Sequence, residues 1–335
     1  MVELDQPDSF WNQAASASEQ GDPFCCRTEW QLSLQETYFP RRRLVLRRNA
    51  TSLLALAERR YPDLGPILEP LDSLWMFGSP LLGPEALDLL ESLLAERRMA
   101  GEPATTLITG VLPGSGLREA LRQRMRSGFD LFRVGTIQVV CASLEGGLDG
   151  FLARRSRVFR KRLRQATQLA AARGLVFERL APRTASESDA AFARMLAVER
   201  TSWKGLAGRG IEEPTSSAFY AAMARRLAVA GTGRVIFARL AERDVGYIFG
   251  GLAGRVYRGQ QFSYADDLAP WSIGNLLQQE QIRWLVEDGV ERYDLGPWMA
   301  YKDHWTERPV GMEALLLRPK ARSAPSPRVG RESSG

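Results

Sequence analysis

Short runs of alternating apolar and polar residues dominate the chain from residue 234 to 264. The runs RVIFARL, VGYIFGGL and RVYRGQQFSY are separated by the short turns AERD and AG. A period of two with tight polar turns predicts three antiparallel strands in a meander. Upstream, LVFERL predicts a strand and residues 187–201 predict a helix. The second half of the chain is therefore predicted to be an α/β unit.

A glycine-bearing turn follows the meander and opens a helix. The turn carries Ser272 and Gly274, the helix ends at Gly289, and a short strand at 292–295 leads into YKDHW. Glycine lets the backbone approach a ligand closely, and the free N–H groups at the positive end of a helix attract anions. The turn is a candidate anion site, although many helices begin after a glycine without binding a ligand.

The first half shows the same succession of elements. In LDSLWMFGSPLLGPEALDLLESLLAERR, residues 71–98, an apolar strand is predicted to enter the turn at 78–80, and an amphipathic helix starts near Pro84. TTLITGVL predicts the next strand. No run of identities joins the halves, so the repeat rests on pattern alone. The predicted fold class is α/β (α+β), with two tandem modules whose mixed central sheets are flanked by helices.

A strongly basic segment, FLARRSRVFRKRLRQATQLAAARG, connects the modules at residues 151–174. From Arg154 to Arg164 it holds seven basic residues in eleven and no acidic one. Apolar residues recur on one helical face, so we predict a helix that ends at Gly174. Two interpretations stay open: the arginines are solvated on a surface helix, or they face an anionic ligand or RNA.

The composition mainly excludes some classes of protein and site. The 335 residues, 44% of them apolar, allow two soluble globular domains. No apolar run is long enough to cross a bilayer and the polar start lacks a signal-peptide pattern, so we expect a cytoplasmic protein without a transmembrane segment. Three cysteines and one histidine provide neither a disulfide framework nor zinc spacing, so no metal is expected. Only four of the 45 basic residues are lysine, which makes each lysine informative.

These observations divide the chain into five parts. They are a loosely ordered N-terminus, a degenerate first module, a basic connecting helix, a catalytic module and a disordered tail rich in proline and serine. Their bounds are residues 1–21, 22–150, 151–174, 175–318 and 319–335.

The order of the meander, the glycine-bearing turn, the helix and the following strand resembles that of the GNAT acyltransferase fold. Within that superfamily the chain is similar to the acetyltransferases associated with cellulose and exopolysaccharide biosynthesis (CelD-like), which are related to the FemAB aminoacyl-tRNA-dependent transferases. The matching pieces span residues 22–318 and are DPFCCRTEW, LWMFGSPLLG, RRSRVFRKRLRQ, VERTSWKG, SIGNLL, RYDLG and YKDHW. Two departures stand out. Ile273 replaces the proline of the usual Ser-Pro-Gly turn, and either Asp266 or Asp267 stands near the position of the family's aspartate.

The resemblance implies that acetyl-CoA or another acyl-CoA is the cosubstrate and that the turn binds its pyrophosphate. The residues expected to offer backbone donors are Ser272, Ile273, Gly274, Asn275 and Leu276. The residues expected to contact the acceptor are Trp203, Tyr264 and Tyr301. For Trp203, core packing is the alternative interpretation.

Four residues are catalytic candidates. Lys302 could hold a substrate carboxylate or the developing oxyanion, or act as a base if it is desolvated, whereas the alternative is a surface lysine. His304 suits proton transfer near neutral pH, and a structural histidine is the alternative. Glu199 could take a proton from an acceptor amine through water. Asp267, at the exit of the meander, is a further candidate.

The expected reaction is transfer of an acyl group, most simply acetyl, from coenzyme A to an amine or hydroxyl that attacks the thioester directly. The acceptor would be a small molecule, a saccharide or another amine. One rival is a FemAB-like aminoacyl-tRNA-dependent ligase, in which the basic helix contacts tRNA. Another is a non-catalytic scaffold of polysaccharide biosynthesis. The acceptor, the acyl chain length and the oligomeric state stay open.

Overall fold

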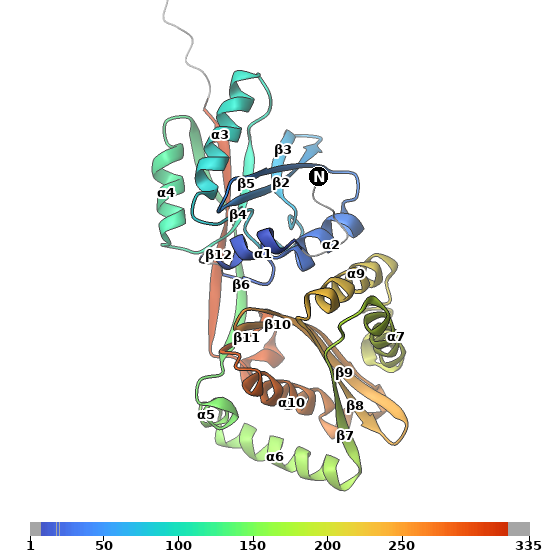
Figure 1. The fold of residues 1–335 in the computed structure, drawn as a ribbon. Coiled ribbons are helices and arrows are strands. Elements are labelled where there is room, and N and C mark those ends of the chain that lie inside the picture. Colours follow the sequence, from blue (N-terminus) through green and yellow to red (C-terminus); the bar gives the residue numbers. More distant parts are fainter. Residues whose placement is uncertain (1–7, 18, 20, 321–335) are drawn as a thin grey trace, which may run out of the picture.

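A computed structural model describes residues 8–17, 19 and 21–320. Within them the strands form one 12-stranded mixed sheet with helices on both faces, so the predicted mixed α/β class is confirmed (Figure 1). The strand order is β1-β2-β3-β5-β12-β6-β11-β10-β9-β8-β7, and β4 pairs with β2. The predicted disordered tail lies, from residue 321 onward, outside the described residues.

Two long strands join the halves of this sheet. β6 (Phe129–Ser143) and β12 (Arg308–Pro319) run antiparallel along their whole length. β6 also pairs with β11 of the second half, while β12, the last strand among the described residues, pairs with β5 of the first half. The two predicted central sheets are therefore continuous, because one strand from each half crosses the boundary. The predicted bounds of the five parts stay a prediction.

Helices cover both faces of the first half of the sheet (Figure 1). Leucines of α3 pack on one face, and α1 and α2 cover the other. Its strands are β1 (Arg43–Arg48), β2 (Leu53–Tyr61), β3 (Gly65–Pro70), β4 (Leu81–Leu82) and β5 (Thr106–Val111). Its helices are α1 (Ser9–Ser16), α2 (Thr28–Tyr38), α3 (Ala86–Met99) and α4 (Gly116–Met125).

Two segments of this half differ from the sequence predictions. Residues 9–16, expected within a loosely ordered N-terminus, form α1, because Asp8 caps the helix and Trp11 is buried with its indole N–H donating to the Cys26 carbonyl at 2.9 Å. The segment 71–77, predicted as a strand, is a turn. The carboxylate of Asp72 accepts backbone N–H groups from Trp75 to Gly78 and so holds this turn.

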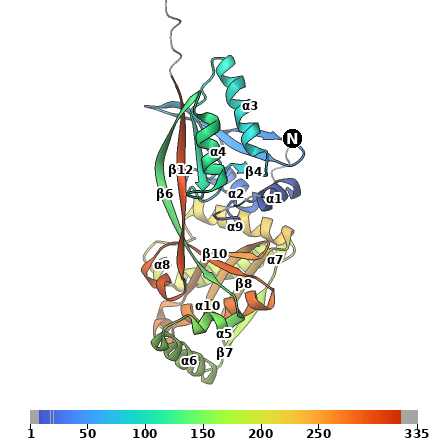
Figure 2. The ribbon, with the colours of Figure 1, turned by 90° about the vertical axis from the view of Figure 1, so that its left-hand side faces the viewer.

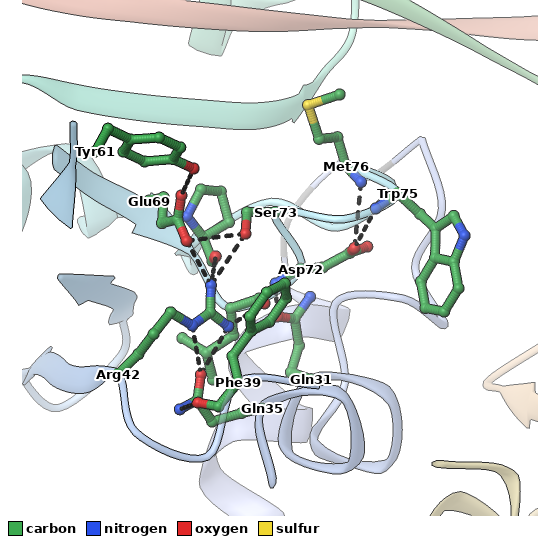
Figure 3. A network of polar contacts seen from close by, with 12 residues as sticks. Gln31, Gln35, Phe39, Arg42, Tyr61, Glu69, Asp72, Ser73, Trp75 and Met76 are labelled. Carbon is green, nitrogen blue, oxygen red and sulfur yellow. Dashed lines mark hydrogen bonds and ion pairs between the residues drawn. The ribbon is translucent and has the colours of Figure 1, made fainter. Parts of the chain in front are cut away.

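A buried arginine ties the same turn to its surroundings (Figure 3). The Arg42 guanidinium donates to the side chains of Gln35 and Glu69 and to the Leu71 carbonyl. Because its partners come from α2, β3 and the turn, this one side chain fixes three elements.

The second half of the sheet is the predicted meander with its flanking strands. Its strands are β7 (Leu175–Leu180), β8 (Gly233–Leu240), β9 (Arg243–Ala253), β10 (Val256–Tyr264) and β11 (Arg292–Pro297). α5 (Gly147–Ala153), α6 (Arg157–Ala172) and α10 (Ile273–Glu287) pack on one face. α7 (Ala185–Thr201) and α9 (Pro214–Ala230) pack on the other, together with α2 (Figure 1). Short helices complete it: α8 (Trp203–Leu206), η1 (Asp266–Trp271) and η2 (Ala300–His304).

The basic connecting segment is not one helix. α5 ends at Ala153, and α6 starts after Ser156, whose hydroxyl accepts the Phe159 N–H at 3.2 Å. This N-cap interrupts the predicted helix. The predicted apolar face of α6 is confirmed, since Leu163 and Ala170 are buried against the core. Among the described helices, none is both long and apolar enough to span a bilayer.

Candidate functional site

The parallel strands β10 and β11 separate soon after they pair. Only three residue pairs are in register, from Val256–Arg292 to Arg258–Asp294. Beyond them β10 has a bulge between Gly259 and Gln261, and β11 has one opposite β6 between Asp294 and Gly296. A bulge bends its strand and raises the local twist. The two strands therefore diverge and leave backbone edges that no neighbouring strand covers.

A cavity of about 600 Å³ opens at this divergence. Its walls come from α8, the end of β10, the first turn of α10 and the segment around η2. A narrow extension of about 50 Å³ runs between β10 and β11, along Gly259, Tyr293 and Leu295. The volume of the main cavity, about 600 Å³, is typical of ligand pockets. A second hollow of about 620 Å³, between β1 and α3, is lined by other residues and contains none of the predicted site residues.

The N-terminus of α10 faces the cavity with free backbone donors. Ser272, Gly274 and Asn275 line the cavity, whereas the side chains of Ile273 and Leu276 are buried in the core. Among the described residues, the N–H groups of Ile273 and Gly274 have no acceptor. These two donors lie at the positive end of the helix dipole and can bind an anion.

Local geometry adapts this turn to a close ligand. Ser272 has a left-handed backbone with φ of 58°, which costs a non-glycine residue on the order of 1–3 kcal/mol and is typical of functional turns. A Cβ on Gly274 would lie 3.1 Å from the rings of both Phe262 and Tyr264. The glycine thus keeps open the space between the helix and β10.

Lys302 is buried beside the cavity, with 6% of the residue exposed. Its Nζ donates to the carbonyls of Leu295 at 2.6 Å and Pro297 at 2.7 Å. Leu295 lies just past the last registered pair of β10 and β11, so the amine sits at the point of divergence. Burial, with a smaller contribution from Arg258, lowers the pKa of Lys302 to about 7. This burial excludes the alternative interpretation of Lys302 as a surface lysine, while its catalytic role stays a prediction.

Lys204 is a second cavity lysine that the sequence did not single out as a site residue. Its Nζ donates to the Phe262 carbonyl at 2.7 Å and lies 3.6 Å from Oε1 of Glu199. Glu199 is fully buried behind it, and its other oxygen accepts the Tyr247 hydroxyl at 3.0 Å. Burial lowers the pKa of Lys204. Glu199 does not line the cavity and lies behind Lys204, and its predicted role of taking a proton through water stays a prediction.

Trp203, Tyr264 and Tyr301 line the cavity, as their predicted contact with the acceptor requires. Trp203 is half exposed, so its alternative interpretation as a core residue is excluded. The role of each residue stays a prediction. No carboxylate stands among the residues that line the cavity; its charged groups are Lys204 and Lys302.

Two predicted catalytic residues lie elsewhere. Asp267 is exposed and pairs with Arg243 at 2.9 Å, and the hydrogen bond from Arg243 lowers its pKa. It sits on η1, whose turn directs the side chain to the surface, away from the cavity. His304 is exposed and does not line the cavity; its ring packs 5.9 Å from Phe159. The adjacent Trp305 does reach the cavity, where its indole N–H donates to Asn275 at 3.3 Å.

A buried charge network below the divergence was not predicted. Arg258 pairs with Asp22 at 2.8 Å, and Arg292 with Asp294 at 2.8 Å. Burial raises the pKa of Asp294 to about 6. Only the neighbouring bulge of β10 has a signal in the sequence, because a glycine inside a strand, here Gly259, often marks a bulge. Within the described residues, no group of three or more His, Cys, Asp and Glu side chains gathers where a metal could bind.

Comparison with known proteins gives a sequence match and a set of structural matches. The family described as acetyltransferase (GNAT) domain matches residues 157–304. No curated protein matches the sequence. FemX has a similar structure, with a TM-score of 0.65 and 12% identity over 92% of this chain and 94% of its own.

Two further solved structures are similar over most of their length. One is a conserved protein of unknown function from Bacteroides thetaiotaomicron, with a TM-score of 0.64 and 8% identity over 95% of this chain and 98% of its own. The other is the C-terminal domain assigned to a lysylphosphatidylglycerol synthetase from Agrobacterium fabrum, with a TM-score of 0.55 and 12% identity over 92% and 90%. At these identities the likeness concerns the fold alone.

The residues that match the family and the residues that line the cavity belong to the same part of the chain. Residues 157–304 include α6, the meander, β11, α10 and η2, and with them every wall of the cavity except Trp305. The region that contains the diverging strands therefore matches a GNAT acetyltransferase domain.

Proposed function

We propose that the chain transfers an acyl group from an acyl-CoA, most simply acetyl-CoA, to an amine or hydroxyl. The observation that carries this proposal is the divergence of β10 and β11 with the N-terminus of α10 at its open end. This arrangement offers an extended channel between strand edges and an anion site at its mouth. A thioester on a long arm with a pyrophosphate needs both features.

The residues present fit such a donor. The N–H groups of Ile273 and Gly274 would hold the pyrophosphate, and the open edge of β10 from Gln260 onward would hold the amide-containing arm. Gly274 leaves the room that a side chain would fill. Bound acyl-CoA supplies an activated carbonyl, and the chain positions the acceptor and manages its proton.

Lys302 is the residue proposed to take that proton. With its pKa lowered to about 7, much of the amine is neutral near physiological pH. A neutral amine has two N–H donors and one lone pair. The carbonyls of Leu295 and Pro297 accept the two N–H groups. The lone pair is then available to accept a proton at Nζ from the attacking amine or hydroxyl.

The acceptor is proposed to enter beside Trp203 and Tyr301. This side of the cavity combines aromatic rings with Lys204. A small molecule, a saccharide or another amine is compatible with these groups, and acetyl transfer in polysaccharide biosynthesis by the CelD-like branch is the finer proposal. Lys302 lines the cavity and could accept a proton there, which argues against the scaffold interpretation.

Aminoacyl transfer is the second candidate. Two of the similar structures are FemX and the domain assigned to a lysylphosphatidylglycerol synthetase, and each covers more than nine tenths of this chain. Five exposed basic residues of α6, which form no ion pair with any residue that the structure describes, would suit a nucleic-acid donor: Arg157, Arg160, Lys161, Arg162 and Arg164.

A thermal-shift experiment with acetyl-CoA, longer acyl-CoAs and deacylated tRNA separates the candidates. A ligand of the folded state at 100 times its Kd adds about 2.7 kcal/mol to the free energy of unfolding, which raises the melting temperature by several degrees. We expect acyl-CoA to stabilise the wild type and not Gly274→Val. Stabilisation by tRNA alone would favour aminoacyl transfer, and stabilisation by neither would contradict both.

A further inference from the structure

Exposed apolar side chains gather on both sides of the cavity mouth. Trp203 and Leu206 of α8 are 52% and 68% exposed. On the other side, Trp298, Met299 and Tyr301 are 56%, 52% and 42% exposed. We call these five residues the apolar lip. Large apolar groups that cluster in this way mark interaction surfaces, whereas single exposed ones do not.

A hydrogen bond and a ring contact hold two residues of the lip in place. The indole N–H of Trp298 donates to Asp303 at 2.7 Å, and the ring of Tyr301 packs 5.7 Å from Phe262. Lys204, next to Trp203, is anchored on the carbonyl of Phe262. The rings of Trp298 and Tyr301 are therefore exposed in fixed positions, which favours a defined partner over random exposure.

The helix α6 begins beside the lip, at η2. We call its five exposed basic residues, Arg157, Arg160, Lys161, Arg162 and Arg164, the basic face. Arg154 and Arg155 pair with Glu307, but the next five basic residues, Arg157 to Arg164, are exposed. Within the part of the chain that the structure describes, none of these five forms an ion pair. Phe159 of α6 packs 5.0 Å from Trp305, directly after η2. α6 and α8 both lie on the left of the lower half in Figure 2.

We propose that the apolar lip and the basic face of α6 together dock on an anionic lipid bilayer, with the cavity mouth toward the membrane. Tryptophan and tyrosine favour the membrane interface, and arginines at the surface attract anionic headgroups. Leu206 and Met299 favour lipid over RNA, because they neither stack well on bases nor form hydrogen bonds. This inference concerns a surface and does not require a particular donor.

The docked state would bring an amphiphilic acceptor directly to the cavity. Each cation near an anionic surface contributes on the order of 1 kcal/mol to binding, and the effect falls off within a Debye length. Removing three cations should therefore weaken binding roughly 10- to 100-fold. The apolar lip should add a contribution that salt does not screen.

Vesicle flotation of the full chain tests this surface. The probes are vesicles of phosphatidylcholine alone and of phosphatidylcholine mixed with phosphatidylglycerol. The charge variant is Arg157→Gln/Arg160→Gln/Arg164→Gln, and its control removes three exposed arginines of the first half, Arg41→Gln/Arg60→Gln/Arg126→Gln. The lip variant is Leu206→Ser/Trp298→Ser, and its control is Leu64→Ser/Met99→Ser, also exposed. Circular dichroism confirms that each variant is folded.

We expect the wild type and both controls to float with phosphatidylglycerol vesicles and not with phosphatidylcholine alone. The charge variant should lose binding roughly 10- to 100-fold, and the lip variant should retain less binding than its control at high salt. The proposal is overturned if the wild type does not bind phosphatidylglycerol vesicles, or if controls and test variants lose binding equally. Binding to single-stranded RNA that depends on the same arginines, without vesicle binding, would assign the surface to RNA instead.

Discussion

Replacing Lys302 with methionine tests the chemistry assigned to the cavity. Methionine keeps the length of the side chain but removes its proton acceptor and its two donors to Leu295 and Pro297. Loss of one positioned group at a reacting centre typically lowers turnover 10²-fold or more. We expect that loss in kcat with little change in acyl-CoA affinity, because the free N–H groups of α10 do not depend on Lys302.

The pH profile distinguishes a base from a cation that holds the oxyanion. A base must be neutral, so wild-type kcat/KM should rise as pH increases through about 7 and then level off. A cation would give the opposite sign, with activity falling above pH 7. Lys302→Arg should not restore activity, because a guanidinium stays protonated and is wider than an ammonium. Normal turnover by Lys302→Met, or a falling profile in the wild type, would refute the proposed base.

The same pKa shift affects stability. Since the pKa of Lys302 is lowered in the folded state, only the unfolded state holds this proton between pH 7 and about 10.4. Stability from this group therefore rises with pH across that window and is flat below it. Denaturation at several pH values should show a smaller rise in Lys302→Met. Two carbonyls left without donors should also lower its free energy of unfolding at every pH, by about 1–3 kcal/mol each.

Four further substitutions, one of them a control, test other parts of the site. Gly274→Val should abolish acetyl-CoA binding in calorimetry while the protein stays folded, because the added methyl groups fill the space beside two rings of β10; unchanged affinity would remove the anion site. Arg258→Met should lower the free energy of unfolding by about 3–5 kcal/mol, since it leaves Asp22 unpaired in the interior, whereas Arg243→Met at an exposed pair should cost about 0–1 kcal/mol. Similar costs for both would contradict the buried network. Asp267→Asn should keep kcat/KM within about a factor of two, and a tenfold loss would return this residue to the catalytic candidates.

The sequence predicted what depends on local periodicity. The meander, the turn at 272–274 and the helix after it follow from alternating residues, a glycine and an apolar stripe, and all three are present. Lys302 could be singled out from the sequence for two reasons. Lysine is rare in this chain, and this lysine follows the short strand after the glycine-bearing turn and its helix.

Features that depend on long-range pairing could not be predicted. Nothing local indicates that β12 completes the sheet of the first half, because any apolar strand of its length would fit. The segment 71–77 has the apolar residues of a strand, yet the buried carboxylate of Asp72 captures its backbone donors. Asp267 is a candidate from its place at the exit of the meander, but a neighbouring arginine on β9 holds it at the surface.

Amide hydrogen exchange with and without acetyl-CoA tests whether the donor binds between the diverging strands and the N-terminus of α10. The proposed donor site contains the free N–H groups of Ile273 and Gly274 and the uncovered edge of β10 from Gln260 to Phe262. Acetyl-CoA should slow exchange in peptides covering these two segments and leave exchange in the first half of the chain unchanged. Unaltered exchange in both segments at saturating acetyl-CoA, or protection confined to the hollow between β1 and α3, would contradict the proposed donor site.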